Sequence, residues 1–256
     1  MKILVQNLKN GETFLEDVPN PRLSKNGVLI QTSYSLVSLG TERTLVEFGK
    51  SNLIQKARQQ PEKVLQVLDK IKSDGLLPTM EVVFNRLDQP LPLGYCNVGK
   101  VIEVGSNVTE FCAGDRVASN GSHSEIVSSP KNLVAKIPKK VTDEEATFTV
   151  IGSIGLQGMR LLKPSYGETI VVYGLGLVGL ITCQLLKANG CNAIGIDIDE
   201  AKCQIAKKWC IETINPNLND PIKTVSSITG GVGCDGVIIT ASNKSNKIIS
   251  SSAQMS

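Results

Sequence analysis

A glycine-rich loop between a strand-like and a helix-like segment limits the fold of this chain more than any other feature. ETIVVYG is typical of a buried strand, LVGLITCQLLKANG is typical of a helix, and Gly174-Leu175-Gly176-Leu177-Val178-Gly179 joins them. This is the G-x-G-x-x-G pattern in its full context, with a strand before the loop and a helix after it. Strand, tight loop and helix in this order predict a βαβ unit and therefore a parallel sheet.

Each glycine of the loop has a predicted purpose. Gly174 permits the tight turn, Gly176 lets the backbone approach a pyrophosphate, and Gly179 lets the helix pack closely on the strand. The first turn of the helix then offers N–H groups and a partial positive charge to phosphate groups. The predicted cofactor-binding residues of the loop are Gly174, Gly176, Leu177, Val178 and Gly179.

An acidic residue ends the next predicted strand. Asp197 closes GIDI, about 20 residues beyond the loop, where a carboxylate accepts the ribose hydroxyls of a dinucleotide. A carboxylate repels a 2′-phosphate, and no arginine follows nearby, so we predict NAD(H) rather than NADP(H) as the cofactor. Asp199 is interpreted as a helix N-cap rather than a second ribose ligand.

Strand-like and helix-like segments alternate from about residue 141 to the last residue, 256. DEEATFTVIGSIGLQGMRLL reads as one helix with an acidic first turn. The strands that follow the loop are NAIGIDI, ETIN and CDGVIIT, and the helices are DEAKCQIAKKWC, PIKTVSSITG and NKIISSSAQM. We predict a dinucleotide-binding domain over residues 141–256.

Residues 1–140 have a different pattern, with many short strands separated by turn residues. Such a pattern predicts a small barrel-like β domain. It is interrupted by a helical stretch over residues 47–88, in which Pro61 suits a first helical position and Gly75 suits a C-terminal stop. This stretch is either an amphipathic pair that covers the β domain or a lid on the substrate side.

The composition excludes several classes of protein. A net charge of +3 without a cluster of basic and aromatic residues gives no sign of nucleic-acid binding. No apolar run reaches the length of about 18 residues that a membrane helix needs. The seven cysteines are scattered and never spaced C-x-x-C, and the chain has one histidine, His123. This argues against disulfides and multi-histidine metal sites and favours the cytoplasm.

The chain resembles the medium-chain dehydrogenase/reductase superfamily, of the zinc alcohol dehydrogenase type. The resemblance is carried by three stretches, GKVIEVGSNVTEFCAGDRV, SHSEIVSSPKNLVAKIP and GETIVVYGLGLVGL. It implies an α/β plus β fold, in which a GroES-like β-barrel domain (1–140) precedes a truncated Rossmann domain (141–256). It also implies an oxidoreductase that acts on an alcohol or carbonyl with NAD(H).

Departures from the pattern of that superfamily predict that no metal is bound. Where zinc members have G-H-E-x-x-G, with a histidine ligand, this chain has Gly94-Tyr95-Cys96-Asn97-Val98-Gly99. Leu39 stands in the place of the first cysteine ligand, and the third ligand place, near Thr149, has no cysteine or histidine. The four-cysteine structural lobe is also missing. No set of three or four converging ligands survives, as Zn²⁺ requires.

Two residues are predicted to be catalytic. Thr41 matches the hydroxyl that relays protons in the superfamily, and Tyr95 takes a ligand position from which it could donate a proton to a carbonyl oxygen. The alternative for Tyr95 is packing. Cys96 is interpreted as a small buried residue and His123 as a structural residue of the strand GSHSEIV. Glu42 is either a carboxylate of the site or an ion-pair partner.

The helical stretch together with SLGTE and PLGYCNVG is most similar to zinc-less members in which this module is fused to a second oxidoreductase domain. That subgroup is associated with surface-polysaccharide and nucleotide-sugar pathways, which implies a small, sugar-like substrate. A homo-oligomer is compatible with the sequence. The chain ends after the fourth predicted strand of a sheet that has six in this superfamily, so we expect a fragment. The alternative to an enzyme is a non-catalytic dinucleotide-binding module or an inactive fragment of a longer dehydrogenase.

Overall fold

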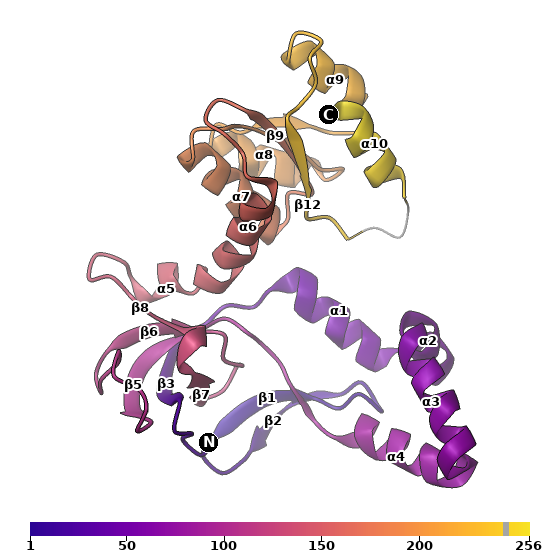
Figure 1. Ribbon diagram of the computed structural model, residues 1–256, viewed down its shortest axis with the longest axis vertical. Helices are drawn as coiled ribbons and strands as arrows, with labels where there is room; N and C mark the ends of the chain where they lie inside the picture. Colours follow the sequence, from indigo (N-terminus) through magenta and orange to yellow (C-terminus); the bar gives the residue numbers. More distant parts are fainter. Residues whose placement is uncertain (243–245) are drawn as a thin grey trace. The chain divides into compact units, whose positions relative to one another are not determined.

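The computed structural model describes residues 1–242 and 246–256 and divides into two compact units (Figure 1). The first unit is Met1–Phe148 and the second is Thr149–Ser256. The division lies beyond the predicted boundary at residues 140 and 141. The predicted single helix at this point is wrong, because two helices form, α5 (Asp143–Ala146) and α6 (Thr149–Leu162).

Packing explains why α5 belongs to the first unit. Ala146 of α5 is buried against Val98 and Ala118, which lie on two strands of the β domain. Arg116 also reaches Asp143, the first residue of α5, and donates from its Nε atom to Oδ1 at 2.8 Å. The β domain therefore holds this short helix by both apolar and charged contacts.

The first unit is built on two antiparallel sheets. The larger sheet has the order β7-β3-β5-β6-β8 and the smaller sheet has the order β2-β1-β4. The strands of the larger sheet are β3 (Gly27–Ser35), β5 (Asn97–Val104), β6 (Arg116–Ser119), β7 (Ile126–Pro130) and β8 (Val134–Lys136), with a short 3₁₀ turn, Lys131–Leu133, before β8. The strands of the smaller sheet are β1 (Lys2–Gln6), β2 (Thr13–Asp17) and β4 (Leu91–Pro92). The core between the strands consists of alternate residues of the larger sheet and one loop, Val28, Ile30, Val101, Val108, Val117 and Val127.

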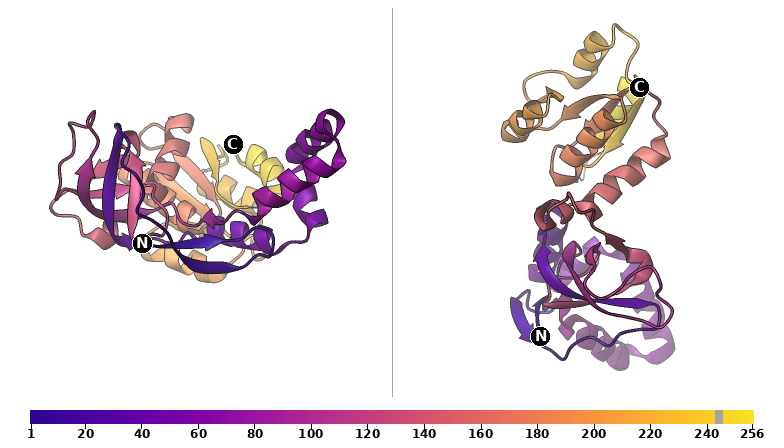
Figure 2. Two further views of the ribbon diagram at one scale, coloured as in Figure 1. Left: turned by 90° about the horizontal axis from the view of Figure 1, so that it is seen from below. Right: turned by 90° about the vertical axis from the view of Figure 1, so that its left-hand side faces the viewer.

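Four helices interrupt the strand pattern of this unit. They are α1 (Leu39–Lys50), α2 (Leu53–Gln59), α3 (Pro61–Asp74) and α4 (Leu76–Asp88). Pro61 begins α3 and Gly75 ends it, as predicted. The helical region begins at Leu39 rather than at residue 47, and the carboxylate of Glu42 in the first turn of α1 accepts the N–H of Ser38 at 2.7 Å. Figure 2 shows α2 and α3 at the end of this unit that lies away from the larger sheet.

The second unit contains a parallel sheet with the order β11-β10-β9-β12 in its described residues. Its strands are β9 (Thr169–Tyr173), β10 (Asn192–Ile196), β11 (Glu212–Ile214) and β12 (Gly236–Ile239). Its helices besides α6 are α7 (Leu177–Ala188), α8 (Glu200–Lys208), α9 (Pro221–Ile228) and α10 (Lys247–Met255). Strands alternate with helices as the sequence predicts.

Both faces of this sheet are covered. Ile170 and Val172 of β9 pack in one buried cluster with residues of α6, α7 and α8, whereas Val171 packs in another with residues of α9 and α10. A strand with both faces buried explains the continuous apolar run TIVVY. Within the described residues, no helix is both long and apolar enough to cross a membrane.

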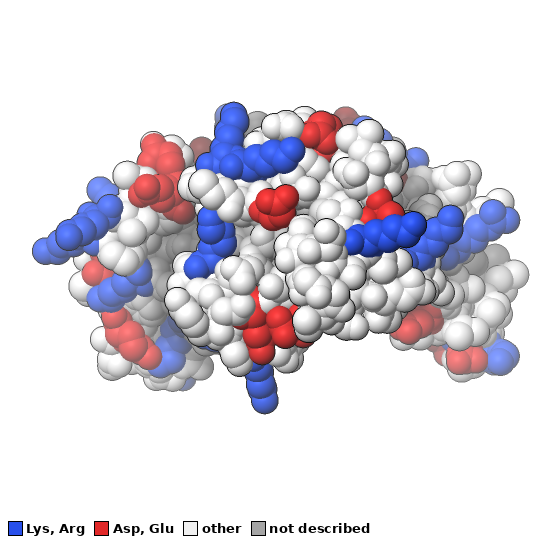
Figure 3. Space-filling view, turned by 90° about the horizontal axis from the view of Figure 1, so that it is seen from above, with Lys and Arg blue, Asp and Glu red and all other residues white. Residues whose placement is uncertain are grey.

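Figure 3 shows one face of the molecule by charge. Lysine and arginine side chains alternate there with aspartate and glutamate side chains, and uncharged residues occupy much of the surface between them. A binding site for a polyanion gathers basic side chains of one sign along a stripe or patch. The face drawn in Figure 3 is not arranged in that way.

Candidate functional site

The glycine-rich loop joins β9 to α7 and bends sharply at its first glycine. Gly174 has a φ of +100°, a conformation that L side chains rarely adopt, and a Cβ there would lie 2.7 Å from the backbone nitrogen of Ala241. A Cβ at Gly179 would collide with the carbonyl oxygen of Gly174. These two glycines are therefore required by the turn and by the close contact of helix and loop.

Gly176 differs from its two neighbours in the motif. It is the N-cap of α7 with a φ of −71°, and no atom lies within 4 Å of the position that a Cβ would take. The space in front of this backbone is therefore open. Leu177, Val178 and Gly179 form the first turn of α7, whose N–H groups have no acceptor within the helix. An open glycine backbone in front of a helix N-terminus fits a pyrophosphate group.

Asp197 lies beside this loop, directly after β10. Its Oδ2 accepts the N–H of Leu175 at 2.7 Å and its Oδ1 accepts the N–H of Asp199 at 2.9 Å. The residue is 8% exposed. Asp199 is the N-cap of α8, as predicted, and accepts the N–H of Ala201 at 3.0 Å. Because a carboxylate oxygen accepts more than one hydrogen bond, Asp197 retains capacity for ribose hydroxyls.

Lys202 is a functional candidate that the sequence did not reveal. Its Nζ lies 3.7 Å from Oδ2 of Asp197 and 3.7 Å from Oδ2 of Asp199. Two acidic residues followed by a lysine one helical turn later are ordinary on a helix surface, so spacing alone gives no signal. The cation offsets part of the negative charge at the place where a ribose would bind.

The two predicted catalytic side chains lie next to each other in the first unit. The hydroxyl of Tyr95 donates to Oγ1 of Thr41 at 3.3 Å. Thr41 lies in the first turn of α1, and Tyr95 precedes β5 after the sharp bend at Gly94, which has a φ of +88°. Tyr95 is half-buried and Thr41 is exposed, so the pair lies at the surface of this unit. Two hydroxyl groups in contact can pass a proton.

The chain was compared with known proteins. The family model described as "Zinc-binding dehydrogenase" matches residues 178–255. D-guloside 3-dehydrogenase of Escherichia coli (strain K12) is 33% identical over 157 residues, which cover 58% of this chain and 44% of that protein. An alcohol dehydrogenase of Geobacillus stearothermophilus is 28% identical over 225 residues, covering 73% of this chain and 66% of that protein.

The fold matches solved structures of the same kind. Alcohol dehydrogenase TADH from Thermus sp. ATN1 superimposes with a TM-score of 0.76 over 100% of this chain and 74% of that chain, at 19% identity. These similarities support a place in the medium-chain dehydrogenase/reductase superfamily. The predicted fold class, a β domain followed by a Rossmann-like unit, is confirmed. The chain nevertheless spans less than half the length of D-guloside 3-dehydrogenase.

The structure describes the residues that the resemblance matches to the metal ligands of zinc dehydrogenases. Leu39 is the first residue of α1 and is 76% exposed, and Cys96 is fully buried. Thr149 begins α6. Among the described residues, no three histidine, cysteine, aspartate or glutamate side chains lie close enough together to hold a metal ion. The burial of Cys96 agrees with its interpretation as a packing residue.

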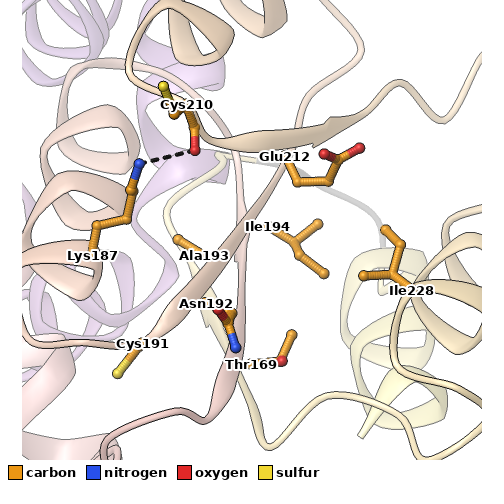
Figure 4. Close-up of a pocket in the computed structure, with 9 residues that line it drawn as sticks. All are labelled: Thr169, Lys187, Cys191, Asn192, Ala193, Ile194, Cys210, Glu212 and Ile228. Atoms are coloured by element: carbon orange, nitrogen blue, oxygen red, sulfur yellow. Dashed lines mark hydrogen bonds between the residues drawn. The ribbon is translucent and has the colours of Figure 1, made fainter.

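A hollow of the second unit lies away from the loop. It has a volume of about 600 Å³, and three of its lining residues, Thr169, Asn192 and Glu212, begin β9, β10 and β11 (Figure 4). Lys187 lies at one side of this hollow and donates to the carbonyl oxygen of Cys210 at 3.0 Å. Because dinucleotides bind at the carboxyl ends of parallel strands, a hollow at the amino ends is not the cofactor site.

Sequence reasoning missed a second group in the first unit. His123 precedes β7 rather than lying in a strand, and its ring contacts two residues that are distant in sequence. Its Nε2 lies 2.9 Å from Oε2 of Glu42, and its Nδ1 lies 2.8 Å from Oγ of Ser35. These contacts span 81 and 88 residues, so no local pattern could have indicated them.

Proposed function

We propose that this protein is a zinc-independent, NAD(H)-dependent oxidoreductase. Its substrate would be the alcohol or carbonyl group of a sugar-like molecule. One observation carries the proposal: the carboxylate of Asp197 lies against the glycine-rich loop, hydrogen-bonded to Leu175, while the backbone at Gly176 faces open space. A ribose at the carboxylate and a pyrophosphate at the glycine are the two requirements of an adenine dinucleotide.

Independence from zinc is supported by the side chains that occupy the ligand places. Tyr95 and Leu39 replace the histidine and the first cysteine, and neither a leucine nor a neutral tyrosine is a zinc ligand of the usual kind. A tyrosine hydroxyl can instead donate a hydrogen bond to the substrate oxygen that would otherwise meet the metal. The contact with Thr41 at 3.3 Å orients the hydroxyl of Tyr95.

The sugar-like substrate is supported by similarity to D-guloside 3-dehydrogenase, whose name states that a guloside is oxidised. When bound, the nicotinamide cofactor would accept or supply the hydride. The residues of this chain would bind and orient the dinucleotide and hold the proton of the alcohol. The cytoplasm, a homo-oligomer and a fused second oxidoreductase domain remain our expectations for the whole protein.

The preference for NAD(H) over NADP(H) is also part of the proposal. The charge of Asp197 repels a 2′-phosphate, but Lys202 at 3.7 Å weakens that repulsion. Its side chain is 43% exposed, so solvent screens much of its effect. We therefore expect NADPH to bind about tenfold or more weakly than NADH, which corresponds to about 1.4 kcal/mol.

The test is a titration of the chain with NADH, followed by the rise in nicotinamide fluorescence. Asp197→Asn should weaken binding about 10- to 100-fold, because hydrogen bonds to a charged group contribute about 1.5–3 kcal/mol. The matched control is Asp235→Asn, since Asp235 also accepts a backbone N–H, that of Thr169 at 2.8 Å, but at the amino end of β12. Equal weakening by both substitutions, or no binding by the unsubstituted chain, would contradict the proposal.

The second candidate is a dinucleotide-binding module without catalysis. One observation favours it: the family model matches residues 178–255, which lie in the second unit, and does not extend to the first unit with Tyr95 and Thr41. The two candidates differ in one result. If NADH binds but no hydride transfer is found with a panel of sugars, sugar nucleotides and aldehydes, the non-catalytic module is favoured. Metal analysis adds a separate test, because stoichiometric zinc in the purified chain would contradict zinc independence.

A further inference from the structure

Three side chains of the first unit form a continuous hydrogen-bonded chain that nothing above assigns to a function. Ser35 ends β3, Glu42 lies in the first turns of α1, and His123 lies before β7. The Ser35 Oγ to Nδ1 distance is 2.8 Å, and the Nε2 to Glu42 Oε2 distance is 2.9 Å. A hydroxyl, an imidazole and a carboxylate in this order are the parts of a base-activated hydroxyl group.

The surroundings of Glu42 decide where the ring proton lies. Its Oε1 accepts the N–H of Ser38 at 2.7 Å, and the N-terminus of α1 favours a negative charge at this place. An ionised carboxylate can only accept hydrogen bonds. Nε2 of His123 must therefore carry a proton and donate it to Oε2 of Glu42, so the lone pair of a neutral ring is on Nδ1.

That lone pair points at the Ser35 hydroxyl. The imidazole and the Glu42 carboxylate are buried, each 8% exposed, whereas Ser35 is exposed. A proton taken up by Nδ1 would create a cation next to a buried anion, so the charge of the ring would be compensated where it forms. Ser35 is therefore the solvent-exposed end of this hydrogen-bonded chain, and the carboxylate of Glu42 is its buried end.

Close packing holds the ring in this orientation. A Cβ at Gly94 would lie 2.6 Å from the imidazole, so the ring lies directly on the backbone next to Tyr95. Glu42 in turn follows Thr41, the partner of Tyr95. The hydroxyl pair and the histidine group thus share the same two backbone segments, which places them in one region of the first unit.

We propose that Ser35 and His123 transfer the proton of the alcohol substrate, and that Glu42 is a positioning residue which fixes the tautomer of His123. The proposal rests on the proposed function. In the oxidation direction, the substrate hydroxyl gives its proton to Ser35 Oγ while the proton of Ser35 passes to Nδ1. The hydrogen on the carbinol carbon leaves as hydride to the nicotinamide. An alcohol and the oxidised cofactor give a carbonyl, the reduced cofactor and one proton on the imidazole, which solvent then removes.

The tautomer is directly measurable because the chain has one histidine. Two-bond ¹H–¹⁵N correlation spectra of the labelled chain should show a neutral ring protonated on Nε2. In Glu42→Gln, one amide oxygen must serve two donors. The oxygen is held by the N–H of Ser38, so the NH₂ group faces Nε2 and forces it to accept. We expect the proton to move to Nδ1 in this variant.

The matched control is Glu47→Gln on the same helix. Glu47 pairs with Arg43 at the surface, 2.7 Å away, and does not touch His123. It should leave the Nε2–H tautomer unchanged. A ring protonated on Nδ1 in the unsubstituted chain, or a tautomer that does not respond to Glu42→Gln, would overturn the role of Glu42.

A second readout tests the reactivity of Ser35 without cofactor or substrate. With p-nitrophenyl acetate, the acetyl group is transferred to Oγ, p-nitrophenolate leaves and the proton of Ser35 goes to Nδ1. Peptide mapping by mass spectrometry should show Ser35 acetylated at least about tenfold faster in the unsubstituted chain than in Glu42→Gln. Ser106, an exposed serine of the same unit, is the internal reference. Equal rates in the two chains would overturn the proposal.

Turnover gives the third readout and separates this proposal from the proposed function. Ser35→Ala and His123→Asn should lower kcat about 100-fold, the usual contribution of a positioned acid or base, while the Kd of NADH stays unchanged. Failure of the unsubstituted chain to bind NADH would contradict the proposed function and leave the tautomer and acetylation tests to decide the serine and histidine roles. If NADH binding and kcat are both unchanged in Ser35→Ala and His123→Asn, the proton transfer by Ser35 and His123 is overturned and the proposed function is not.

Discussion

The glycine-rich loop and the histidine group are built in opposite ways. The loop consists of consecutive residues whose backbone matters: a turn at Gly174, an open edge at Gly176 and a close contact at Gly179. The histidine group consists of side chains from segments that are 81 and 88 residues apart. The first group is determined by a local stretch of sequence and the second by the way the β domain folds.

This difference indicates which of the two groups is sensitive to substitutions that lie far away in the sequence. The loop depends on its own βαβ unit and on residues 240 and 241 after β12, which contact Gly174, so substitutions elsewhere in the sequence should leave it intact. The histidine group depends on β3, α1 and the segment before β7 keeping their places, so it should report on any loosening of the first unit. The predictions below are ordered from the largest expected effect to the smallest.

The largest effect is expected from a methyl group at Gly179. Because its Cβ would collide with the carbonyl oxygen of Gly174, Gly179→Ala should lower the free energy of unfolding by about 3 kcal/mol. Gly176→Ala is the control, because its Cβ would enter open space and its φ is already negative. It should cost at most about 1 kcal/mol and yet weaken NADH binding. Urea denaturation and the fluorescence titration separate the two effects.

A result in which both substitutions destabilise the chain equally would break the distinction between a packing glycine and a ligand-facing glycine. A result in which Gly176→Ala changes neither stability nor binding would contradict the assignment of the open edge to pyrophosphate.

The next largest effect is expected at Gly94, where the β domain has its own close approach. Gly94→Ala introduces a Cβ 2.6 Å from the His123 ring at a φ of +88°, which should cost about 2 kcal/mol. Gly114→Ala has nearly the same φ, +91°, but no atom within 4 Å of its Cβ, so it isolates the backbone strain of about 1 kcal/mol. Denaturation curves of the two variants give the difference.

The histidine spectrum adds a second measurement to this pair. Only the substitution at Gly94 should move the ring signals of His123. If Gly114→Ala moves them as well, the ring is not held by local contact with the Gly94 backbone, and the argument for close packing fails.

Much of the fold could be predicted because its signals are local. The strand and helix order after the loop, the N-cap at Asp199, and the start of α3 at Pro61 and its stop at Gly75 each depend on a few neighbouring residues. The cofactor loop belongs to the same class, since strand, glycines and acidic residue follow one another within a single βαβ unit.

The rest could not be predicted because it depends on tertiary contacts. The helix expected from residue 143 to residue 162 divides, because Ala146 packs on the β domain with Val98 and Ala118. Helix α1 begins early, and its Glu42 reaches back to Ser38 and across to His123. In the site, Tyr95 and Thr41 were each selected by resemblance, and their contact depends on the position of α1 beside the segment before β5. The role of Lys202 depends on the position of α8.

A smaller effect is expected from the ion pair that joins β6 to α5. Arg116 donates to Asp143 and, from Nη2, to the carbonyl oxygen of Val141 at 2.8 Å, with the two side chains of the pair 31% and 21% exposed. Arg116→Met should cost about 1 kcal/mol of unfolding free energy, because a half-buried forked pair lies between surface and buried pairs.

Lys9→Met is the control for this pair. Lys9 and Asp88 are 3.0 Å apart but about half exposed, so its loss should cost less than about 0.5 kcal/mol. If the two substitutions cost the same, burial does not set the strength of ion pairs in this unit.

The smallest effect is expected at the exposed pair of Glu110 and Lys131, 2.8 Å apart. Its hydrogen bond with Lys131 lowers the pKa of Glu110 from 4.5 to about 2. A folded-state pKa below the unfolded one stabilises the folded chain above pH 4.5, and this stabilisation is lost as the pH falls through about 2. The difference in urea midpoint between the unsubstituted chain and Glu110→Gln should therefore shrink between pH 5 and pH 2.

The same difference in urea midpoint should also shrink in 1 M NaCl, because solvent ions screen an exposed pair, whereas the His123 signals should not respond to the salt. A His123 spectrum that changes with salt as much as the Glu110 effect does would show that the histidine group is not shielded from solvent.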